Sequence, residues 1–454
     1  MITPLFGGGY EAGEVDPDMP IRVSSIRGHL RFWWRATRGA KFDTVEELRQ
    51  REGEIWGSME NPSPVNIEVL DLKCGDRKPC AYYIWRQKNN GKWVWALEWA
   101  KEFMVANRSL PYALFPFQGE RPGNKDPDKT DRPQAETMLS GTFTLVVKCP
   151  SVQRMGVFRP LYNEQREKKG LKLLNDSHDA IEEDVITAVW AWVNFGGIGA
   201  RTRRGCGTLY CQDLAPQDFK SIGDWYSECL NDFKIVPSRP RKWPTLPEKI
   251  LIKGGNDAGA LQCWSDVIGL LQTFRQGRGV GRNPGNNPLY PGRSWWPEPE
   301  TIREVTRLRS TRHPRVTTIP NDAFPRAELG LPIIFHFKGN GDPADTELYP
   351  VVNGEKKARM ASPLILRPLR CKNGDMLQMI LQLNSPRVDE VVLEEAPGTP
   401  RFTKIRDPGL ASYPKSPMGS ASPRVPMRSS AGSALDAFIN FAQEQVNGFT
   451  EVPR

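Results

Sequence analysis

Arginine, histidine and tryptophan side chains gather near the start of the chain, in the segment SSIRGHLRFWWRATRG at 24–39. Guanidinium groups bind phosphates through charge-assisted hydrogen bonds, and an exposed indole can stack on a nucleobase. The segment therefore offers the chemistry of a nucleic-acid contact. Its candidate contact residues are Ser24, Ser25, Arg27, His29, Arg31, Trp34, Arg35 and Arg38.

A glycine-rich basic loop, FGGIGARTRRGCG at 195–207, is the second such cluster. Glycines let a backbone approach a ligand closely, and successive N–H groups in such a loop can form a concavity for an anion. The loop lacks a G-K-[ST] ending and follows a predicted helix, so it is neither a nucleotide P-loop nor a Rossmann fingerprint. The pattern favours a polyanion such as RNA over an ordinary basic surface loop. Its candidate contact residues are Gly196, Gly197, Gly199, Arg201, Arg203, Arg204 and Gly205.

Signals for catalysis or metal binding are weak. The chain has no G-x-S-x-G and no H-E-x-x-H motif, and its eight cysteines include no C-x-x-C pair. His29 could act as a general base in RNA cleavage, where a 2′-hydroxyl attacks its own phosphate. A contact to RNA or to a neighbouring element is the favoured interpretation of His29. We expect no catalytic residue, no metal and no cofactor.

Helical spacing organises the first cluster. Ile26, Leu30 and Trp33 fall on one face and predict a packed side, whereas the arginines fall on another face. Trp34 lies on the basic face, and the sequence leaves core packing and base stacking equally open for it. Gly28 lowers helix propensity by ~1 kcal/mol relative to Ala, which indicates close contact with a neighbouring element or a ligand.

Local signals predict where this helix and the other elements begin and end. Ser24 or Ser25 is expected to cap the helix, and Gly39 to stop it. Further helices are predicted at 44–57, 177–194, 261–275 and 434–446, and strands at 65–71, 142–148, 208–211, 250–253, 331–338, 363–369 and 376–383, the last two joined by an Asn373-Gly374 hairpin turn. Segments 119–133, 276–296 and 396–432 are rich in Gly, Pro, Ser or charge and are predicted to be loops or disordered.

Composition limits the class of protein. The chain has 454 residues, 40 glycines, 40 prolines and a net charge of +9, which favours phosphate-rich partners. It contains no apolar run of 18 residues, and its first residues do not resemble a signal peptide. We therefore expect a cytoplasmic protein without a membrane partner.

At this point the residues resemble a known family. The segments TPLFGGG at 3–9, SSIRGHLRFWWRA at 24–36 and EIWGS at 54–58 are similar to the first-numbered RAMP subunit of the Cmr complex, the type III-B CRISPR effector. GGIGARTRRGCGTL at 196–209 is similar to the glycine-rich loop of RAMP proteins. RSWWPEPETIR at 293–303, FPRAELGLPIIFHF at 324–337 and ARMASPLIL at 358–366 resemble the C-terminal half of the same subunit.

The resemblance implies an α+β fold with two ferredoxin-like (RRM-like) domains and large loop insertions. We expect an N-terminal domain at 1–215, a linker at 216–249, a C-terminal domain at 250–395, and a tail with a short helix at 396–454. The implied function is binding of guide RNA near its 3′ end and capture of target RNA for antiviral defence, together with other Cmr subunits. The implied nuclease residue belongs to another subunit. The alternatives are a RAMP endoribonuclease that trims guide RNA and an assembly protein that touches no RNA.

Overall fold

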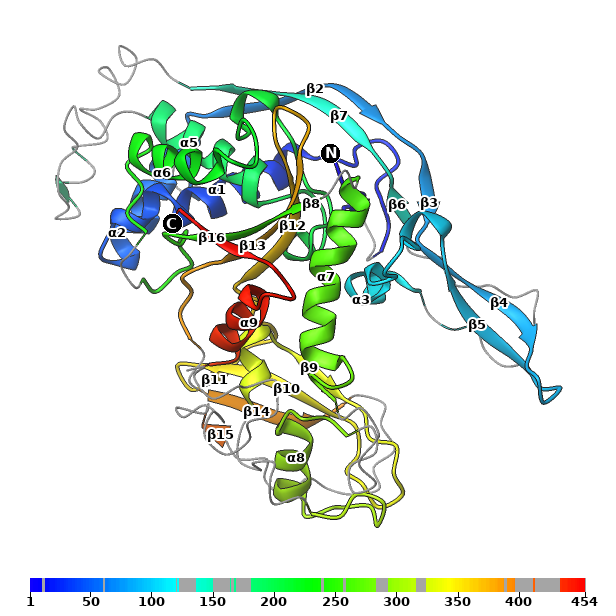
Figure 1. Ribbon diagram of the computed structural model, residues 1–454. Coiled ribbons are helices and arrows are strands. Elements are labelled where there is room, and N and C mark those ends of the chain that lie inside the picture. Colours follow the sequence, from blue (N-terminus) through cyan, green and yellow to red (C-terminus); the bar gives the residue numbers. More distant parts are fainter. Residues whose placement is uncertain are drawn as a thin grey trace. The chain divides into compact units, whose positions relative to one another are not determined.

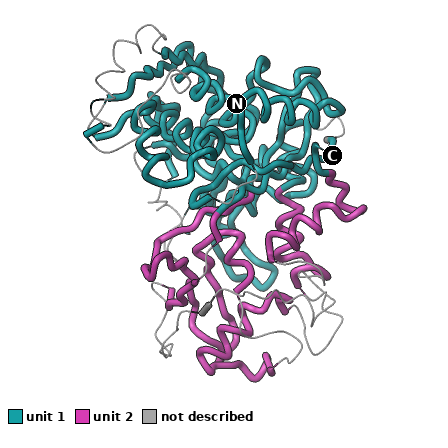
Figure 2. Tube along the Cα trace, turned by 90° about the vertical axis from the view of Figure 1, so that its left-hand side faces the viewer, with its two compact units in different colours: residues 1–267, 365–385, 451–454 teal, residues 268–364, 386–450 magenta. Residues whose placement is uncertain are grey.

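The computed structural model of the chain divides into two compact units (Figures 1 and 2). It describes residues 1–9, 13–59, 62–119, 121, 136–149, 164, 167–168, 181–237, 241–255, 259–282, 293–315, 324–387, 390–396, 411–412 and 433–453. The first unit comprises Met1–Val267, Ile365–Ser385 and Glu451–Arg454, and the second comprises Ile268–Leu364 and Pro386–Thr450. Both mix helices with small antiparallel sheets, which confirms the α+β class.

Helix α1 (Val23–Ala36) lies beside α5 (Ile181–Phe195) in the first unit (Figure 1). Its predicted apolar residues Ile26, Leu30 and Trp33 are all buried. The predicted serine cap is wrong, because Arg22 occupies the N-cap position and both serines are exposed.

The predicted stop of this helix at Gly39 is also wrong. The helix ends at Ala36, where the Thr37 hydroxyl donates to the Trp33 carbonyl at 2.7 Å and so competes with the helical ladder. Gly39 lies in the following 3-10 turn η1 (Arg38–Lys41).

Helix α2 (Val45–Trp56) matches its prediction, and residues that favour helix ends stand at both of its termini. Thr44 and Glu47 form a capping box, in which each side chain accepts from the backbone N–H of the other. Gly57 follows the last turn with a φ of +87°, a conformation that glycine adopts without strain. The remaining helices of this unit are η2 (Lys101–Phe103), α3 (Leu110–Leu114), η3 (Phe115–Phe117), η5 (Thr202–Arg204), η6 (Gln212–Leu214) and α6 (Ile222–Asp232).

The sheets around these helices are short. The predicted strands β2 (Asn66–Cys74) and β7 (Gly141–Lys148) are confirmed and pair antiparallel, with Ile67 opposite Val147. A three-stranded sheet has the order β1 (Leu5–Phe6), β6 (Glu136–Met138), β3 (Arg77–Pro79). The hairpin β4 (Ala81–Gln87) and β5 (Trp93–Trp99) extends away from the body of the unit (Figure 1).

A four-stranded sheet draws together segments far apart in sequence. Its order is β12 (Leu364–Arg370), β13 (Met376–Gln382), β8 (Ile250–Gly255), β16 (Thr450–Val452). The three predicted strands in it are confirmed, and Gly374 turns the β12–β13 hairpin with a φ of +98°. The predicted helix at 261–275 is α7 (Ala260–Gln276).

The second unit has its own sheet and core. Strands β11 (Glu355–Lys356), β10 (Thr346–Val352), β14 (Glu390–Glu395) and β15 (Ala411–Ser412) pair in that order, and β9 (Ile333–Phe335) also pairs with β10. The unit contains helices α8 (Glu298–Thr306), η7 (Pro325–Leu329) and α9 (Ala434–Gln443). Buried Ile302, Phe335 and Leu348 belong to its core. The predicted strand at 331–338 is present but shorter, and the predicted helix at 434–446 ends earlier.

Two sequence predictions about connections differ from the structure. The predicted linker at 216–249 contains α6, whose Ile222, Tyr226 and Leu230 lie at helical spacing and are buried. The predicted strand at 208–211 does not form. The Thr208 backbone instead bonds to the N-terminal segment, accepting from Ile2 N–H at 2.8 Å and donating to the Thr3 hydroxyl at 2.8 Å.

The expected domain boundaries also differ from the compact units. Strands β8, β13 and most of β12, which were expected in a C-terminal domain at 250–395, group with the first unit. The cause is the shared sheet, since a ladder of backbone hydrogen bonds joins segments regardless of their distance in sequence. Most of the predicted loops at 119–133 and 396–432 lies outside the described residues, as does the middle of 276–296.

Candidate nucleic-acid interface

The two clusters predicted from sequence meet at one pocket of about 170 Å³ in the first unit. Helix α1 and the glycine-rich loop contribute most of its lining, and strand β12 contributes one residue. The lining residues are His29, Phe32, Trp33, Phe195, Gly196, Gly197, Thr202, Arg203 and Ile365. The pocket thus combines aromatic rings, one imidazole, one hydroxyl and one guanidinium.

His29 enters this pocket as a neutral ring. Its imidazole stacks on the Trp192 indole, with the ring centroids 6.1 Å apart and the planes 13° apart. Burial lowers the pKa of His29 below its ordinary value of 6.5. At pH 7 the ring therefore carries one hydrogen-bond donor and one acceptor and no charge.

Arg203 supplies the positive charge of the pocket. Its guanidinium lies 5.4 Å from the centre of the Phe32 ring, in cation–π geometry. Burial lowers the pKa of Arg203 to about 10, so it remains a cation at pH 7. The sequence predicted this arginine as a phosphate contact but not its stacking on α1.

A wider groove of about 800 Å³ opens beside α1. Arg27 and Arg31 contribute to its lining, together with residues 56–59 and Ser63. The Arg27 guanidinium is fixed by donating to the Ser63 hydroxyl at 2.7 Å and to the Val65 carbonyl at 3.1 Å. Burial and, less strongly, the charge of Arg31 lower the pKa of Arg27. The groove therefore holds a positioned cation.

Glu52 of α2 partly neutralises the arginine face, which the sequence analysis missed. Arg31 Nε and Arg35 Nη1 each donate to Glu52 Oε1 at 2.6 Å. The three side chains together carry one net positive charge instead of two. Glu52 belongs to another helix, so the helical spacing within α1 contains no signal for it.

Two predicted contact residues are not available to a ligand. Trp34 has no exposed surface, so the hypothesis that its indole stacks on a base is wrong. Arg38 is 8% exposed and donates to the Asp184 carboxylate at 3.0 Å and to the Phe233 carbonyl at 3.0 Å. The physical reason is that α1 contacts α2, β2 and η1 as well as α5, so more than one of its faces is covered.

The glycine-rich loop directs much of its backbone inward. The N–H groups of Gly196, Ile198, Ala200, Gly205 and Gly207 donate to carbonyl groups of the protein.

The prediction that the glycines of this loop make room for a ligand also differs from the structure. At Gly196 a Cβ atom would lie 2.5 Å from the Trp33 indole nitrogen, and at Gly205 it would lie 2.6 Å from the Trp264 ring. Gly196 and Gly205 make room for tryptophans, whereas Gly197 and Gly199 lie against backbone carbonyls. We therefore assign the ligand chemistry of the loop to its side chains.

Arg367 of β12 holds this loop in place, a role that sequence reasoning did not identify. It is fully buried, and its guanidinium donates to the carbonyls of Val193, Gly196 and Leu209 at 3.1, 2.6 and 3.0 Å. Burial lowers the pKa of Arg367 to about 9. The only local signal was an arginine in the middle of a mostly apolar strand, LILRPLR, whose other arginine, Arg370, stands at its end.

The other predicted residues lie at the edge of the interface. Ser24, Ser25 and Gly28 are exposed on α1, and the site of a Cβ on Gly28 has no described atom within 4 Å. The predicted contact of Gly28 with a neighbouring element is therefore not seen among the described residues, and its contact with a ligand stays a prediction. Arg201, Arg204 and Gly199 are half-buried.

The described part of the chain carries neither a metal-binding cluster nor a membrane-spanning helix. No group of three or more His, Cys, Asp or Glu side chains could hold a metal ion there. Among the helices described, none is long and apolar enough to cross a membrane.

Known proteins with similar sequence match part of this chain. Residues 1–210 match the family described as the RAMP superfamily, and this range contains both clusters. The "CRISPR system Cmr subunit Cmr1-2" of Pyrococcus furiosus is 27% identical over 217 residues, which cover 47% of this chain and 92% of that protein. The Cmr1-1 subunit of the same organism is 23% identical over 204 residues, covering 45% of this chain and 44% of that protein.

The resemblance to a RAMP subunit of the Cmr type is thereby confirmed. Among solved structures, the apo crystal structure of Cmr1 from Pyrococcus furiosus has a TM-score of 0.40 at 14% identity and covers 89% of each chain. A cryo-EM structure of the type III-B Cmr-beta bound to cognate target RNA contains a chain with a TM-score of 0.41 at 12% identity, covering 84% of this chain and 92% of that one. The relationship rests on the sequence matches.

Proposed function

We propose that this chain is an RNA-binding, non-catalytic subunit of a type III-B CRISPR effector in the cytoplasm. It would contact guide RNA near its 3′ end, help to capture target RNA, and dock to other Cmr subunits. The similarity to Cmr subunits supports a place in such a complex. The RNA-binding role rests on one observation: α1 and the glycine-rich loop meet at one pocket. We further propose that each half is built on a ferredoxin-like plan.

The pocket and groove suggest how RNA is held. The Arg203 guanidinium lies against Phe32 and can pair with a phosphate, while the neutral His29 ring and the Thr202 hydroxyl can bond a sugar or base edge. Arg27, positioned in the neighbouring groove, can pair with another phosphate. Charge contacts of this kind position the backbone of RNA without reading its sequence.

Loss of Arg27 and Arg203 should weaken RNA binding. In an Arg27→Gln/Arg203→Gln variant, we expect at least a fivefold loss of affinity for a labelled single-stranded RNA, measured by fluorescence anisotropy. The slope of log affinity against log salt should fall in magnitude by about 1.4, because each lost phosphate contact to a single strand removes roughly 0.7.

Arg49→Gln/Arg77→Gln is the matched control, because it removes two charges from exposed arginines of the first unit that line neither the pocket nor the groove. If the Arg27→Gln/Arg203→Gln variant matched this control in both affinity and salt slope, the proposed interface would be wrong.

We propose that the chain does not cleave RNA. His29 lies in the pocket, but among the described residues no carboxylate bonds to its ring. End-labelled guide-repeat RNA incubated with the purified chain should remain intact over hours, with or without divalent metal. Cleavage that disappears in His29→Ala would instead support the endoribonuclease alternative.

A further inference from the structure

An arginine-rich segment follows helix α8 in the second unit. Residues 303–315 read REVTRLRSTRHPR and contain five arginines and one histidine. None of them belongs to the pocket or the groove described above. We call residues 307–315 the arginine loop.

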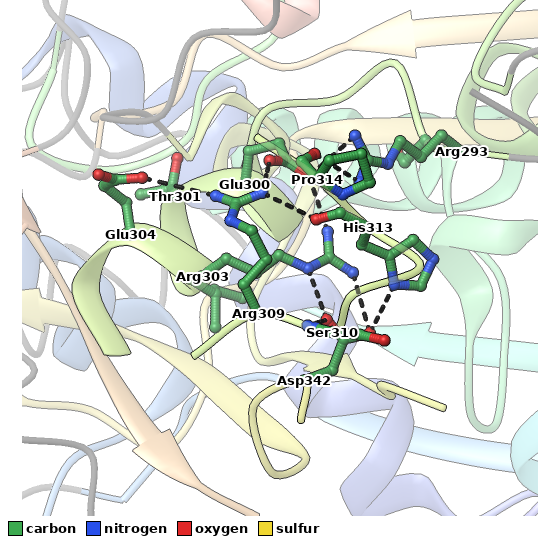
Figure 3. Close-up of polar contacts among 12 residues, drawn as sticks. Arg293, Glu300, Thr301, Arg303, Glu304, Arg309, Ser310, His313, Pro314 and Asp342 are labelled. Carbon is green, nitrogen blue, oxygen red and sulfur yellow. Dashed lines mark hydrogen bonds and ion pairs between the residues drawn. The ribbon is translucent and has the colours of Figure 1, made fainter. Parts of the chain in front are cut away.

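One buried carboxylate fixes the middle of this loop and the last turn of α8 before it (Figure 3). The Asp342 side chain is 1% exposed. It accepts from Arg303 Nε at 2.9 Å, from the Ser310 backbone N–H at 3.1 Å and from His313 Nδ1 at 2.7 Å. Both a side chain and a backbone group of the loop are therefore tied to the same carboxylate.

A second buried carboxylate, that of Glu300 on α8, reinforces the arrangement (Figure 3). It accepts from Arg303 Nη1 at 2.7 Å and from Arg309 Nη1 at 2.6 Å. Arg309 also donates to the His313 carbonyl at 3.3 Å. Arg293 donates to the Pro314 carbonyl at 3.0 Å. The inward-facing arginines thus hold the backbone of the loop.

The outward face of the loop is basic and almost devoid of apolar surface. Arg307, Arg312 and Arg315 are exposed, and Arg315 pairs with the exposed Glu304 at 3.3 Å. Leu308, the one large apolar side chain in the loop, is half-buried. Arg307 ends α8 with a φ of +56°, a conformation that L-residues rarely adopt without support from their surroundings.

We infer that the arginine loop is a second RNA-contact surface, with Arg307 and Arg312 pairing to phosphates of the backbone. The inference rests on the proposed RNA-binding function. Guanidinium groups bind phosphates in a fork geometry, and a loop that is already fixed loses less conformational entropy on binding. A protein partner would need aromatic or aliphatic anchors, which the exposed face lacks. The RNA backbone therefore fits this surface better than a protein does.

The test uses the full chain and a labelled single-stranded RNA. Arg307→Gln/Arg312→Gln should reduce affinity severalfold and lower the salt slope by about 1.4. Arg359→Gln/Arg387→Gln is the matched control, because both of these arginines are exposed in the second unit outside the loop. Equal affinities and salt slopes for the two variants would overturn the inference. The inference would be wrong even if the loop variant alone failed to enter a reconstituted complex, because the loop would then contact protein and not RNA.

The substitution Asp342→Asn distinguishes the effect of a fixed loop conformation from the effect of positive charge alone. This substitution adds one net positive charge while removing the carboxylate that fixes the loop. If only charge mattered, RNA would bind at least as tightly as before. We expect severalfold weaker binding in a variant whose circular dichroism is unchanged, and unchanged or tighter binding would contradict the inference.

The two proposals can fail separately. If the unmodified chain binds no RNA, the proposed function fails and the inference fails with it. If the chain binds RNA through Arg27 and Arg203 but is indifferent to Arg307 and Arg312, only the inference is wrong.

Discussion

Arginine side chains of this protein occupy three different environments. Arg367 and Arg38 are buried and bond to protein carbonyls or carboxylates. Arg27 and Arg203 are half-buried at a groove and a pocket, where they can also reach a ligand. Arg307 and Arg312 are exposed. The net charge of +9 counts all of these equally, whereas only the last two classes can attract RNA.

Arg367→Met should destabilise the first unit. Methionine has a similar length but no donors, so the carbonyls of Val193, Gly196 and Leu209 would lose their buried partner. We expect the free energy of unfolding to fall by about 3 kcal/mol. Chemical denaturation checks this, with Arg370→Met as the control because Arg370 is exposed on the same strand. Equal stability of the two variants would contradict the structural role assigned to Arg367.

The sequence of α1 reveals its buried apolar face but not the environment of every side chain on its other faces. The helical spacing of α1 showed that Ile26, Leu30 and Trp33 are buried, because a face packed against a helix must be apolar. It could not show that Trp34 and Arg38 are also covered, since that depends on η1 and on partners such as Asp184 of α5. The pairing of Glu52 with two arginines was hidden for the same reason.

At the scale of elements, glycines serve two opposite purposes. Gly207 has a φ of +60°, and a Cβ there would collide with the Ile198 carbonyl. Gly28 lies within α1, and no described atom lies within 4 Å of the position that a Cβ would take there. The first glycine is thus required by the fold of the loop, whereas the second costs helix stability without any packing benefit in the described residues.

Alanine substitutions should therefore change stability in opposite directions. Gly207→Ala should lower the free energy of unfolding by at least about 2 kcal/mol, through backbone strain and collision with Ile198. Gly28→Ala should raise it by up to about 1 kcal/mol, because alanine has the higher helix propensity. Thermal denaturation of the two variants beside the parent decides this, and a destabilised Gly28→Ala would show that the helix backbone is packed there.

Local signals in the sequence were enough for most elements. The apolar spacing in α1 and the Asn373-Gly374 turn between β12 and β13 are short-range features, so they could be predicted without a fold. The strand expected at 208–211 failed because its backbone bonds to Ile2 and Thr3, which lie about 200 residues away. A neighbour at that distance leaves no mark on local composition.

At the scale of the whole chain, the compact units could not be predicted from sequence order. The four-stranded sheet combines residues near 250, 370 and 450, and proline-rich composition at 216–249 concealed helix α6. The resemblance to RAMP subunits predicted the class of protein but not this division. Basic surfaces nevertheless occur in each unit, the pocket and groove in the first and the arginine loop in the second.

Photo-crosslinking tests the central claim most directly. The full chain would be irradiated with 4-thiouridine-substituted single-stranded RNA, and the adducts mapped by mass spectrometry. The pocket between α1 and the glycine-rich loop predicts adducts within 27–35 and 196–204, which become weaker in Arg27→Gln/Arg203→Gln. Adducts confined to other segments, or none in the presence of bound RNA, would contradict the claim that RNA is held at this pocket.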